Sequence, residues 1–192
     1  MDLWSWLAES FDLPILEWIA GNLRCGFLDA VMPIITLLGD AGIFWIAISV
    51  VLLFIPKYRK VGLGMGAALI LGLLVCNVTL KPLIARPRPY DYQWEQFGVS
   101  IQLLIEAQHD FSFPSGHTIA SFEAATVLML HSKKAGIPAL ILAALIAFSR
   151  LYLYVHYPTD VLTSVVLGIA FGLLGNWLVQ KGFALRENRR KA

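Results

Sequence analysis

The sequence predicts an all-α, polytopic membrane protein in which six transmembrane helices follow an N-terminal interfacial helix. Hydrophobic residues make up 58% of the 192 residues and charged residues 15%, and the mean hydropathy is +0.69. A soluble domain usually carries ~45–50% apolar and ~25% charged residues, and a chain of this length has too little interior to bury the excess. Disorder is excluded for the same compositional reason. We therefore expect residues 1–192 to form a single membrane-embedded domain.

The N-terminal segment, residues 1–24, mixes tryptophans with acidic residues. Trp4, Trp6 and Trp18 alternate with carboxylates such as Asp12. Tryptophan is enriched where a helix lies at the headgroup level of a bilayer. This pattern predicts an interfacial helix ahead of the first span.

Six apolar stretches follow, and glycine, proline or charged clusters separate them. The expected spans are residues 25–38, 42–56, 62–81, 115–131, 136–154 and 158–180. Gly39-Asp40-Ala41-Gly42 is typical of a tight turn between the first two, and Lys57–Lys60 follow the second. Residues 82–113 are rich in proline and polar side chains and form the one long loop, while residues 181–192 form a basic tail.

The distribution of lysine and arginine predicts the orientation in the membrane. With six spans, both termini and the loops at 57–60 and 131–134 share one side. Eleven of the 15 basic residues fall there: Arg24, Lys57, Arg59, Lys60, Lys133, Lys134, Lys181, Arg186, Arg189, Arg190 and Lys191. We expect this side of the cell membrane to be cytoplasmic, with both termini, and the 82–113 loop to be extracytoplasmic.

Four basic residues remain on the outer side, where the positive-inside rule disfavours them: Lys81, Arg86, Arg88 and Arg150. Ion pairs within the long loop, with Asp91, Glu95, Glu106 or Asp110, would explain Arg86. Ion pairing explains the other three less well, because they lie at the ends of spans beside two histidines.

Those cations belong to three segments that the predicted topology brings to one membrane face. The segments are Lys81 followed after six residues by Arg88-Pro89, Pro114-Ser115-Gly116-His117, and Ser149-Arg150 followed by His156 and Asp160. Each residue has an ordinary structural explanation when taken alone. Their combination on one face favours a functional site.

The residue types predict a phosphate site. Arginine presents a planar fork that matches phosphate oxygens, and lysine adds a point charge, so Lys81, Arg88 and Arg150 suit such a group. Ser115 and Gly116 stand at a predicted helix start, where backbone N–H groups favour an anion and glycine permits close approach. Carboxylates are few and the cations would repel a divalent ion, so we expect neither a metal nor another cofactor.

The two histidines predict covalent chemistry at the phosphate. A neutral imidazole can attack phosphorus, and we assign this role to His156. His117 can protonate the leaving oxygen and then activate water. Asp160 falls in the first turn of a helix that Pro158 favours, close enough to accept the other ring N–H of His156.

The three segments together resemble the signature of the type 2 phosphatidic acid phosphatase family. Every position of that signature is filled, and the resemblance covers residues 25–180. It implies a six-helix membrane fold and metal-independent hydrolysis through a phosphohistidine, with the roles assigned above. Arg86-Pro87 duplicates Arg88-Pro89, but only Arg88 has the family's spacing from Lys81, so Arg86 stays an additional candidate.

The resemblance implies a lipid phosphate or diphosphate as substrate. We favour undecaprenyl diphosphate, which would yield undecaprenyl phosphate, because an outward site matches the side on which that carrier is released. Phosphatidylglycerophosphate and phosphatidic acid are alternatives, and so is transfer of the phosphate to a lipid acceptor or a non-catalytic lipid-binding role. A net charge of +2 argues against nucleic acid as a partner, and the sequence indicates no oligomeric state.

Glu123 lies inside a predicted span, where an ionisable side chain is a functional candidate. We hypothesise that it lines the headgroup pocket, although a hydrogen bond to a neighbouring helix is an equally good explanation. Asp29, in the first span, poses the same question.

Overall fold

The computed structural model describes residues 3–191, with side chains described as far as residue 189. Residues 1, 2 and 192 of the expected interfacial helix and basic tail, and the side chains of Arg190 and Lys191, lie outside the described part. All regular structure in the described residues is helical, which confirms the all-α prediction.

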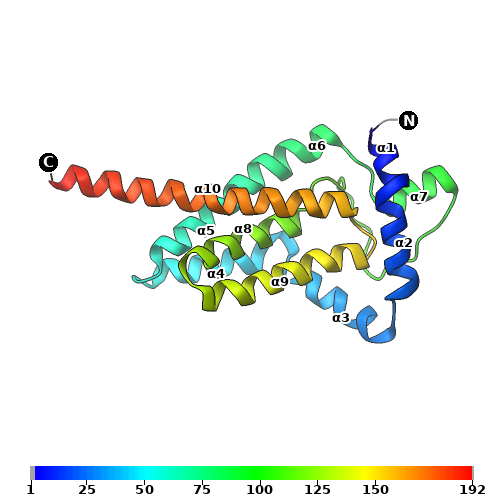
Figure 1. The fold of residues 1–192 in the computed structure, drawn as a ribbon, viewed down its shortest axis with the longest axis horizontal. Coiled ribbons are helices and arrows are strands. Elements are labelled where there is room, and N and C mark those ends of the chain that lie inside the picture. Colours follow the sequence, from blue (N-terminus) through cyan, green and yellow to red (C-terminus); the bar gives the residue numbers. More distant parts are fainter. Residues whose placement is uncertain (1–2, 192) are drawn as a thin grey trace.

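The helices follow one another along the chain with few breaks (Figure 1). They are α1 (Leu3–Leu7), η1 (Ala8–Asp12), α2 (Leu13–Asn22), α3 (Gly26–Leu37), η2 (Asp40–Gly42), α4 (Ile43–Phe54), α5 (Arg59–Gly72), η3 (Leu73–Leu80), α6 (Lys81–Ile84), α7 (Pro89–Phe97), α8 (Gly116–His131), α9 (Lys133–Tyr152) and α10 (Pro158–Lys191). The expected long loop therefore contains a helix, α7, which begins at a proline and ends at Gly98 in the left-handed region, with φ 66°.

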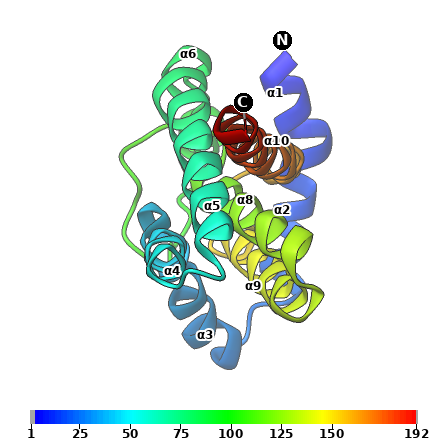
Figure 2. The same cartoon turned by 90° about the vertical axis from the view of Figure 1, so that its left-hand side faces the viewer.

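A bundle of α4, α5, α8, α9 and α10 forms the body of the molecule (Figures 1 and 2). Helix α8 lies in its middle and packs against α5, α9 and α10. Close approach depends on small residues, because a Cβ on Gly175 of α10 would lie 2.6 Å from the backbone nitrogen of Ala68. Trp45, Met65 and Ile146 fill the core between the helices.

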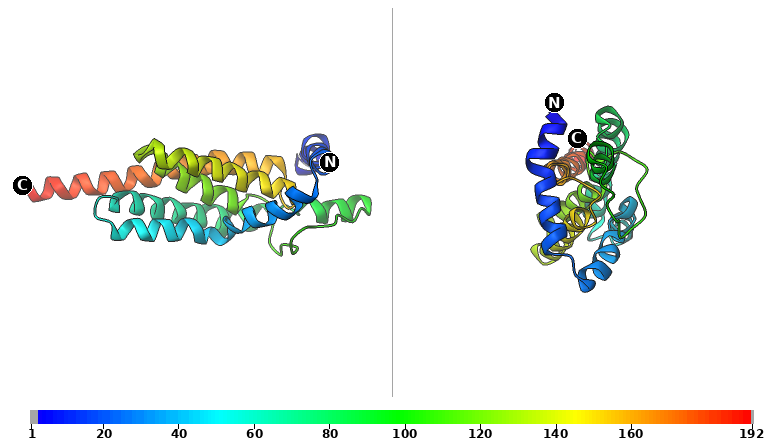
Figure 3. Two further views of the ribbon diagram at one scale, coloured as in Figure 1. Left: turned by 90° about the horizontal axis from the view of Figure 1, so that it is seen from below. Right: turned by 90° about the vertical axis from the view of Figure 1, so that its right-hand side faces the viewer.

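The N-terminal helices lie across one end of this bundle, roughly perpendicular to its long axis (Figures 1 and 3). Leu13, Leu16 and Ile19 face inward and are buried, whereas Trp6 and Trp18 are more than half exposed. This is the arrangement expected of an interfacial helix, with its apolar face on the protein and its tryptophans free to contact lipid.

The number of spans differs from the expectation. Three helical segments are long and apolar enough to cross a membrane: Arg59–Phe97, Lys133–Tyr152 and Pro158–Arg189. Gly26–Leu37 and Asp40–Phe54, bent by 40° at their junction, would count together as a fourth. Helix α8 has 16 residues and falls short of a full span by length. Within the described residues the count of six is therefore not confirmed.

The bend between α3 and α4 also bears on the predicted placement of the termini. A 40° bend continues the path of the chain, whereas two separate spans would need a reversal. The N-terminal helices consequently lie at the opposite end of the bundle from the end of α10 (Figure 1). Arg24, which we expected on the side of the basic tail, instead donates two hydrogen bonds of 3.4 Å to the carbonyl of Gln102 in the long loop. The described ends of the chain thus lie at opposite ends of the bundle, and the side of the membrane that each of them faces stays a prediction.

Candidate active site

The three sequence segments meet in one cavity of about 530 Å³, at the end of the bundle near the N-terminal helices. Its polar lining includes Lys81, Arg88, Gly116, His117, Arg150 and His156. Ser115, Asp160 and Arg86 do not line the cavity but lie buried around it. The predicted residues therefore lie close together in the structure. Some of them face the cavity, and the others are buried behind those that do.

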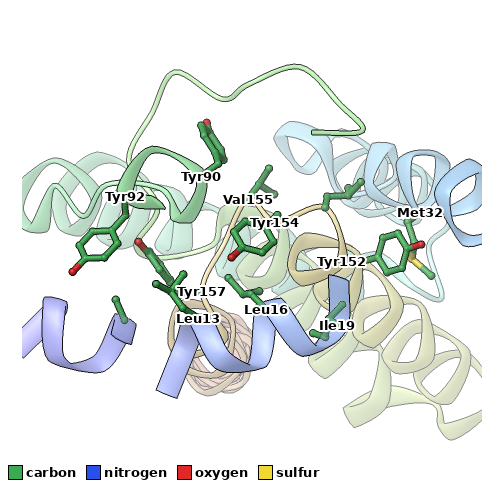
Figure 4. Packing of buried hydrophobic residues seen from close by; sticks show 12 residues of the cluster. Leu13, Leu16, Ile19, Met32, Tyr90, Tyr92, Tyr152, Tyr154, Val155 and Tyr157 are labelled. Carbon is green, nitrogen blue, oxygen red and sulfur yellow. The ribbon is translucent and has the colours of Figure 1, made fainter. Parts of the chain in front are cut away.

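A tyrosine-rich core holds the segment that carries His156 (Figure 4). This segment, residues 153–157, joins α9 to α10 and packs on the inner face of α2. Tyr154 adopts the left-handed region, with φ 61°, and the N–H of Val155 donates to the carbonyl of Arg150 at 3.1 Å. A strained conformation of this kind persists only where the surrounding packing fixes it. The orientation of His156 is thus set by the core beneath it.

His156 is buried, and its two ring nitrogens face different partners. Nδ1 lies 3.6 Å from Oδ2 of Asp160 and 3.5 Å from the hydroxyl of Ser112. Nε2 lies 3.4 Å from a guanidinium nitrogen of Arg88. Burial, and then the charge of Arg88, lower the pKa of His156 well below its ordinary value. The ring is therefore neutral at neutral pH, with Nε2 on the side of the cations.

Asp160 is held behind His156 by a buried network that the sequence did not predict. It sits in the first turn of α10, as expected, and accepts from the Ser112 hydroxyl at 2.5 Å and the Tyr157 N–H at 3.1 Å. Arg86 donates to its other oxygen at 2.5 Å. The same guanidinium pairs with Asp12 of the N-terminal helix at 2.7 Å.

Arg86 therefore belongs to this supporting network and does not face the cavity. Its guanidinium lies 3.6 Å from the ring centre of Tyr157 and 4.8 Å from that of Trp4. The suggestion that Arg86 is ion-paired is confirmed, but its partners are Asp12 and Asp160, not the carboxylates of the long loop.

The three cations that line the cavity differ in how many of their N–H groups have a hydrogen-bond partner. Arg88 donates to the carbonyls of Asp110 at 2.8 Å and Val155 at 2.7 Å, and both Arg88 and Lys81 form ion pairs with the Asp110 carboxylate. Ion pairing within the long loop, which we expected to explain these two cations less well than Arg86, thus occurs for both of them. Arg150 donates to the Thr36 hydroxyl at 2.6 Å, but its Nε and one terminal nitrogen are buried with no partner. Buried unpartnered donors are rare, and these two nitrogens are free to donate to an anion that enters the cavity.

The N-terminus of α8 completes the polar end of the cavity. Ser115 is the N-cap, and its N–H donates to the Ser164 hydroxyl at 2.8 Å, so Ser115 fixes the turn. Gly116 borders the cavity, and a Cβ there would lie 3.2 Å from the side-chain amide of Asn77. The first N–H groups of a helix lack intrahelical partners, and Gly116 and His117 in the first turn of this helix border the cavity.

His117 lies against the break between α3 and α4. Its Nε2 is 3.9 Å from a carboxylate oxygen of Asp40 in η2. A Cβ on Gly39 would come within 2.8 Å of the imidazole ring. The sequence indicated a turn at these residues but gave no sign that the turn contacts a histidine.

Glu123 borders the same cavity, as hypothesised, one to two turns further along α8. It is 1% exposed, and its Oε1 has no hydrogen-bond partner. Asp29 lies elsewhere and accepts from the Tyr152 hydroxyl at 2.6 Å, so its position is explained by packing between α3 and α9.

One wall of the cavity is apolar. It runs between α4 and α5 and consists of Ile46, Val50, Leu53, Leu69, Ile70 and Leu73. Several of these side chains are also exposed at the surface of the bundle, where lipid would contact them. The cavity thus has a cationic end and a lipid-facing apolar side. No group of three or more histidine, cysteine or acidic residues with the geometry of a metal site occurs among the described residues.

The fold and this cavity define a class: a helical membrane protein whose cavity has a cationic end and an apolar side. Residues 61–184 match the PAP2 superfamily, and the chain belongs to that family. This confirms the resemblance drawn from the three sequence segments, all of which fall within the match.

Two relatives and one solved structure illustrate the family. The chain is 31% identical to undecaprenyl-diphosphatase BcrC of Bacillus subtilis over 77% of this chain and 72% of the relative. It is 33% identical to an undecaprenyl-diphosphatase of Sulfolobus acidocaldarius over 70% of this chain, a match that spans only 59% of that relative. The crystal structure of a PAP2-type phosphatidylglycerolphosphate phosphatase from Bacillus subtilis superposes with a TM-score of 0.71 and 30% identity, covering 90% of this chain and 86% of that one.

Proposed function

We propose that the chain is a lipid phosphatase that hydrolyses a terminal phosphate through a phosphohistidine on His156, without a metal. The unpartnered donors of Arg150 carry this proposal, because they are buried in a cavity that already holds Lys81, Arg88 and a neutral His156. The apolar wall supports a lipid as the phosphate carrier.

The reaction would proceed in two displacements at phosphorus. Nε2 of His156 attacks as the bond to the leaving oxygen breaks. His117, protonated when the phosphate dianion is bound beside it, gives that proton to the leaving oxygen and becomes neutral. His117 then takes a proton from water, the hydroxide forms a new bond to phosphorus, and the bond to His156 breaks to release inorganic phosphate. Lys81, Arg88 and Arg150 stabilise the charge on the phosphoryl oxygens, while Asp160 stabilises the imidazolium.

Undecaprenyl diphosphate is the substrate we favour, with undecaprenyl phosphate as product. The names of both undecaprenyl-diphosphatase relatives support this choice. Phosphatidylglycerophosphate is the second candidate, supported by the name of the solved structure. Glu123 borders the cavity beyond the histidines, and we propose that it contributes to this choice of headgroup.

We also propose an orientation for this single membrane-embedded domain. The end of the bundle opposite the cavity carries Lys57, Arg59, Lys60, Lys133, Lys134, Lys181, Arg186 and Arg189. The positive-inside rule makes that end cytoplasmic, together with the tail after residue 181. The active site and the N-terminal helices would then lie on the extracytoplasmic side.

The proposal is tested by phosphate release from purified protein in detergent with EDTA present. Undecaprenyl diphosphate, phosphatidylglycerophosphate and phosphatidic acid serve as substrates, each with and without a lipid acceptor. We expect release from the diphosphate to be fastest, the His156→Ala variant to lose activity, and Glu123→Gln to change the ratio of rates. Loss of wild-type activity with EDTA, or a fully active His156→Ala variant, would overturn the mechanism. Phosphate appearing on the acceptor instead of in solution would make the chain a phosphotransferase.

A further inference from the structure

The carboxylate of Asp110 occupies part of the site assigned to phosphate. One oxygen forms an ion pair with Lys81 and the other with Arg88. The Asp110 side chain is 55% exposed, whereas those of Lys81 and Arg88 are 11% and 3% exposed. The carboxylate thus reaches in from the solvent side and covers two buried cations.

The loop around Asp110 is anchored on both sides of it. The Tyr90 hydroxyl bonds the N–H and carbonyl of Gln108, at 3.0 and 2.8 Å. The N–H of Ser112 donates to the carbonyl of Arg86 at 2.8 Å. These bonds keep Asp110 at the mouth of the cavity, so rotation of its side chain is enough to expose or cover the cations.

Asp110 is an anion in the resting protein. Burial raises the pKa of its carboxyl, but Lys81 and Arg88 outweigh burial and the pKa is lowered. Its two oxygens nevertheless satisfy only two of the three cations. Nε and one terminal nitrogen of Arg150 stay without a partner. A group with three free oxygens and more than one charge would reach all three cations, which a carboxylate cannot do.

We propose that Asp110 is a specificity-determining residue: an internal monoanion that a terminal phosphate displaces and a phosphodiester does not. The proposal rests on the phosphatase site proposed above. A terminal phosphate carries a charge of about −1.5 to −2 and three free oxygens. The phosphodiester of a bulk membrane phospholipid carries one charge and two free oxygens, so it gains nothing over the carboxylate already in place. Asp110 would keep abundant phospholipids out of a site that faces the bilayer.

The test compares Asp110→Asn with the wild type in two measurements. Binding of inorganic phosphate is followed by isothermal titration in detergent, which needs no turnover. If the carboxylate occupies the cations about nine times in ten, its removal strengthens phosphate binding about tenfold. Phosphatidylglycerol, a phosphodiester, is titrated into the hydrolysis assay in mixed micelles, and we expect it to inhibit Asp110→Asn at much lower concentration than the wild type.

Two variants control this experiment. Glu106→Gln removes an exposed carboxylate from the same loop, outside the cavity lining, and should leave both measurements unchanged. Asp110→Glu retains the charge and should restore exclusion of phosphatidylglycerol. Phosphate binding that is unchanged or weaker in Asp110→Asn, or equal inhibition of both proteins by phosphatidylglycerol, would overturn the proposal. A wild type that binds phosphate but hydrolyses no lipid would refute the proposed function and leave the binding test of Asp110 intact.

Discussion

Arg86 and Arg88 are two positions apart and carry identical side chains, yet they have different surroundings. Arg86 lies between two buried carboxylates, Asp12 and Asp160, and is flanked by aromatic rings. Arg88 faces the cavity and the exposed Asp110. The repeated Arg-Pro in the sequence therefore combines a cation buried in an ion-pair network with a cation that faces the cavity.

Removing these two arginines should have different consequences. Arg86→Ala leaves two buried carboxylates without their cation, and losing one member of a buried ion pair costs about 3–5 kcal/mol. We expect a large drop in the thermal unfolding temperature in detergent. Arg88→Ala should lower the affinity for inorganic phosphate at least tenfold with a smaller change in unfolding temperature. Equal effects of the two substitutions on both quantities would contradict this distinction.

The protonation state of His156 can be measured directly. Because its pKa lies well below the ordinary value of about 6.5, the ring should stay neutral at pH 6.5 and become protonated only on further acidification. The ¹⁵N shifts of labelled imidazoles report this state, and His156→Asn identifies the signal. The nucleophilic form, and with it kcat/KM, should be lost as the pH falls through this lowered pKa. A ring that is already half protonated at pH 7 would show that burial does not control His156.

The break between α3 and α4 is the element that links the fold to the site. Ala41 and Gly42 both adopt positive φ there, at 47° and 67°. Gly39 packs so closely that an added Cβ would lie 2.7 Å from Ile146 and 2.8 Å from the ring of His117. If α3 and α4 were one continuous helix, Asp40 would not lie beside His117, and Gly39 would not pack against its ring.

Gly39→Ala should therefore lower turnover. The added methyl group cannot be accommodated unless His117 or Ile146 moves, and a displacement of about 1 Å at a catalytic group can cost about a hundredfold in rate. Gly21→Ala is a matched control, because no atom lies within 4 Å of a Cβ there. Steady-state phosphate release checks both variants. Full activity of Gly39→Ala would show that the turn does not position His117.

The whole chain is asymmetric along its long axis. The N-terminal helices and the long loop gather at one end, and the 34-residue helix α10 carries the basic tail to the other (Figure 1). His117, Arg150 and His156 line the cavity near the first of these ends. Since α3 and α4 form one bent path, the N-terminal helices lie at the same end of the bundle as the residues proposed for catalysis.

Cysteine labelling tests this arrangement in cells that express the chain. In a Cys25→Ser background, an impermeant maleimide should label exposed Ser10→Cys and Glu95→Cys from outside. Arg186→Cys should react only after permeabilisation. Under the six-span topology, Ser10 would instead label together with Arg186, and that result would restore both termini to one side.

The sequence by itself determined most of the helices, the membrane setting, and the cations and histidines that line the cavity. Hydropathy and helix-start residues act locally, so Ser115 and Pro158 marked the starts of α8 and α10 correctly. The spacing of Lys81, Arg88 and the two histidines was enough to assign the chain to its family. This spacing is visible in the sequence because each of these residues lies near the end of a helix.

Only the tertiary structure decided how the chain enters the bundle and which carboxylates serve the site. The glycines and aspartate at residues 39–42 are compatible with a chain reversal and with a bend between two helices. In the structure this segment bends, and it packs against His117. Asp12 meets Arg86 across 74 residues, Asp110 meets Lys81 across 29, and Asp40 meets His117 from another helix. Opposite charges attract in any arrangement that brings them close, so charge alone does not determine which residues pair. The pairs depend on how the helices pack, and the local sequence does not show that packing.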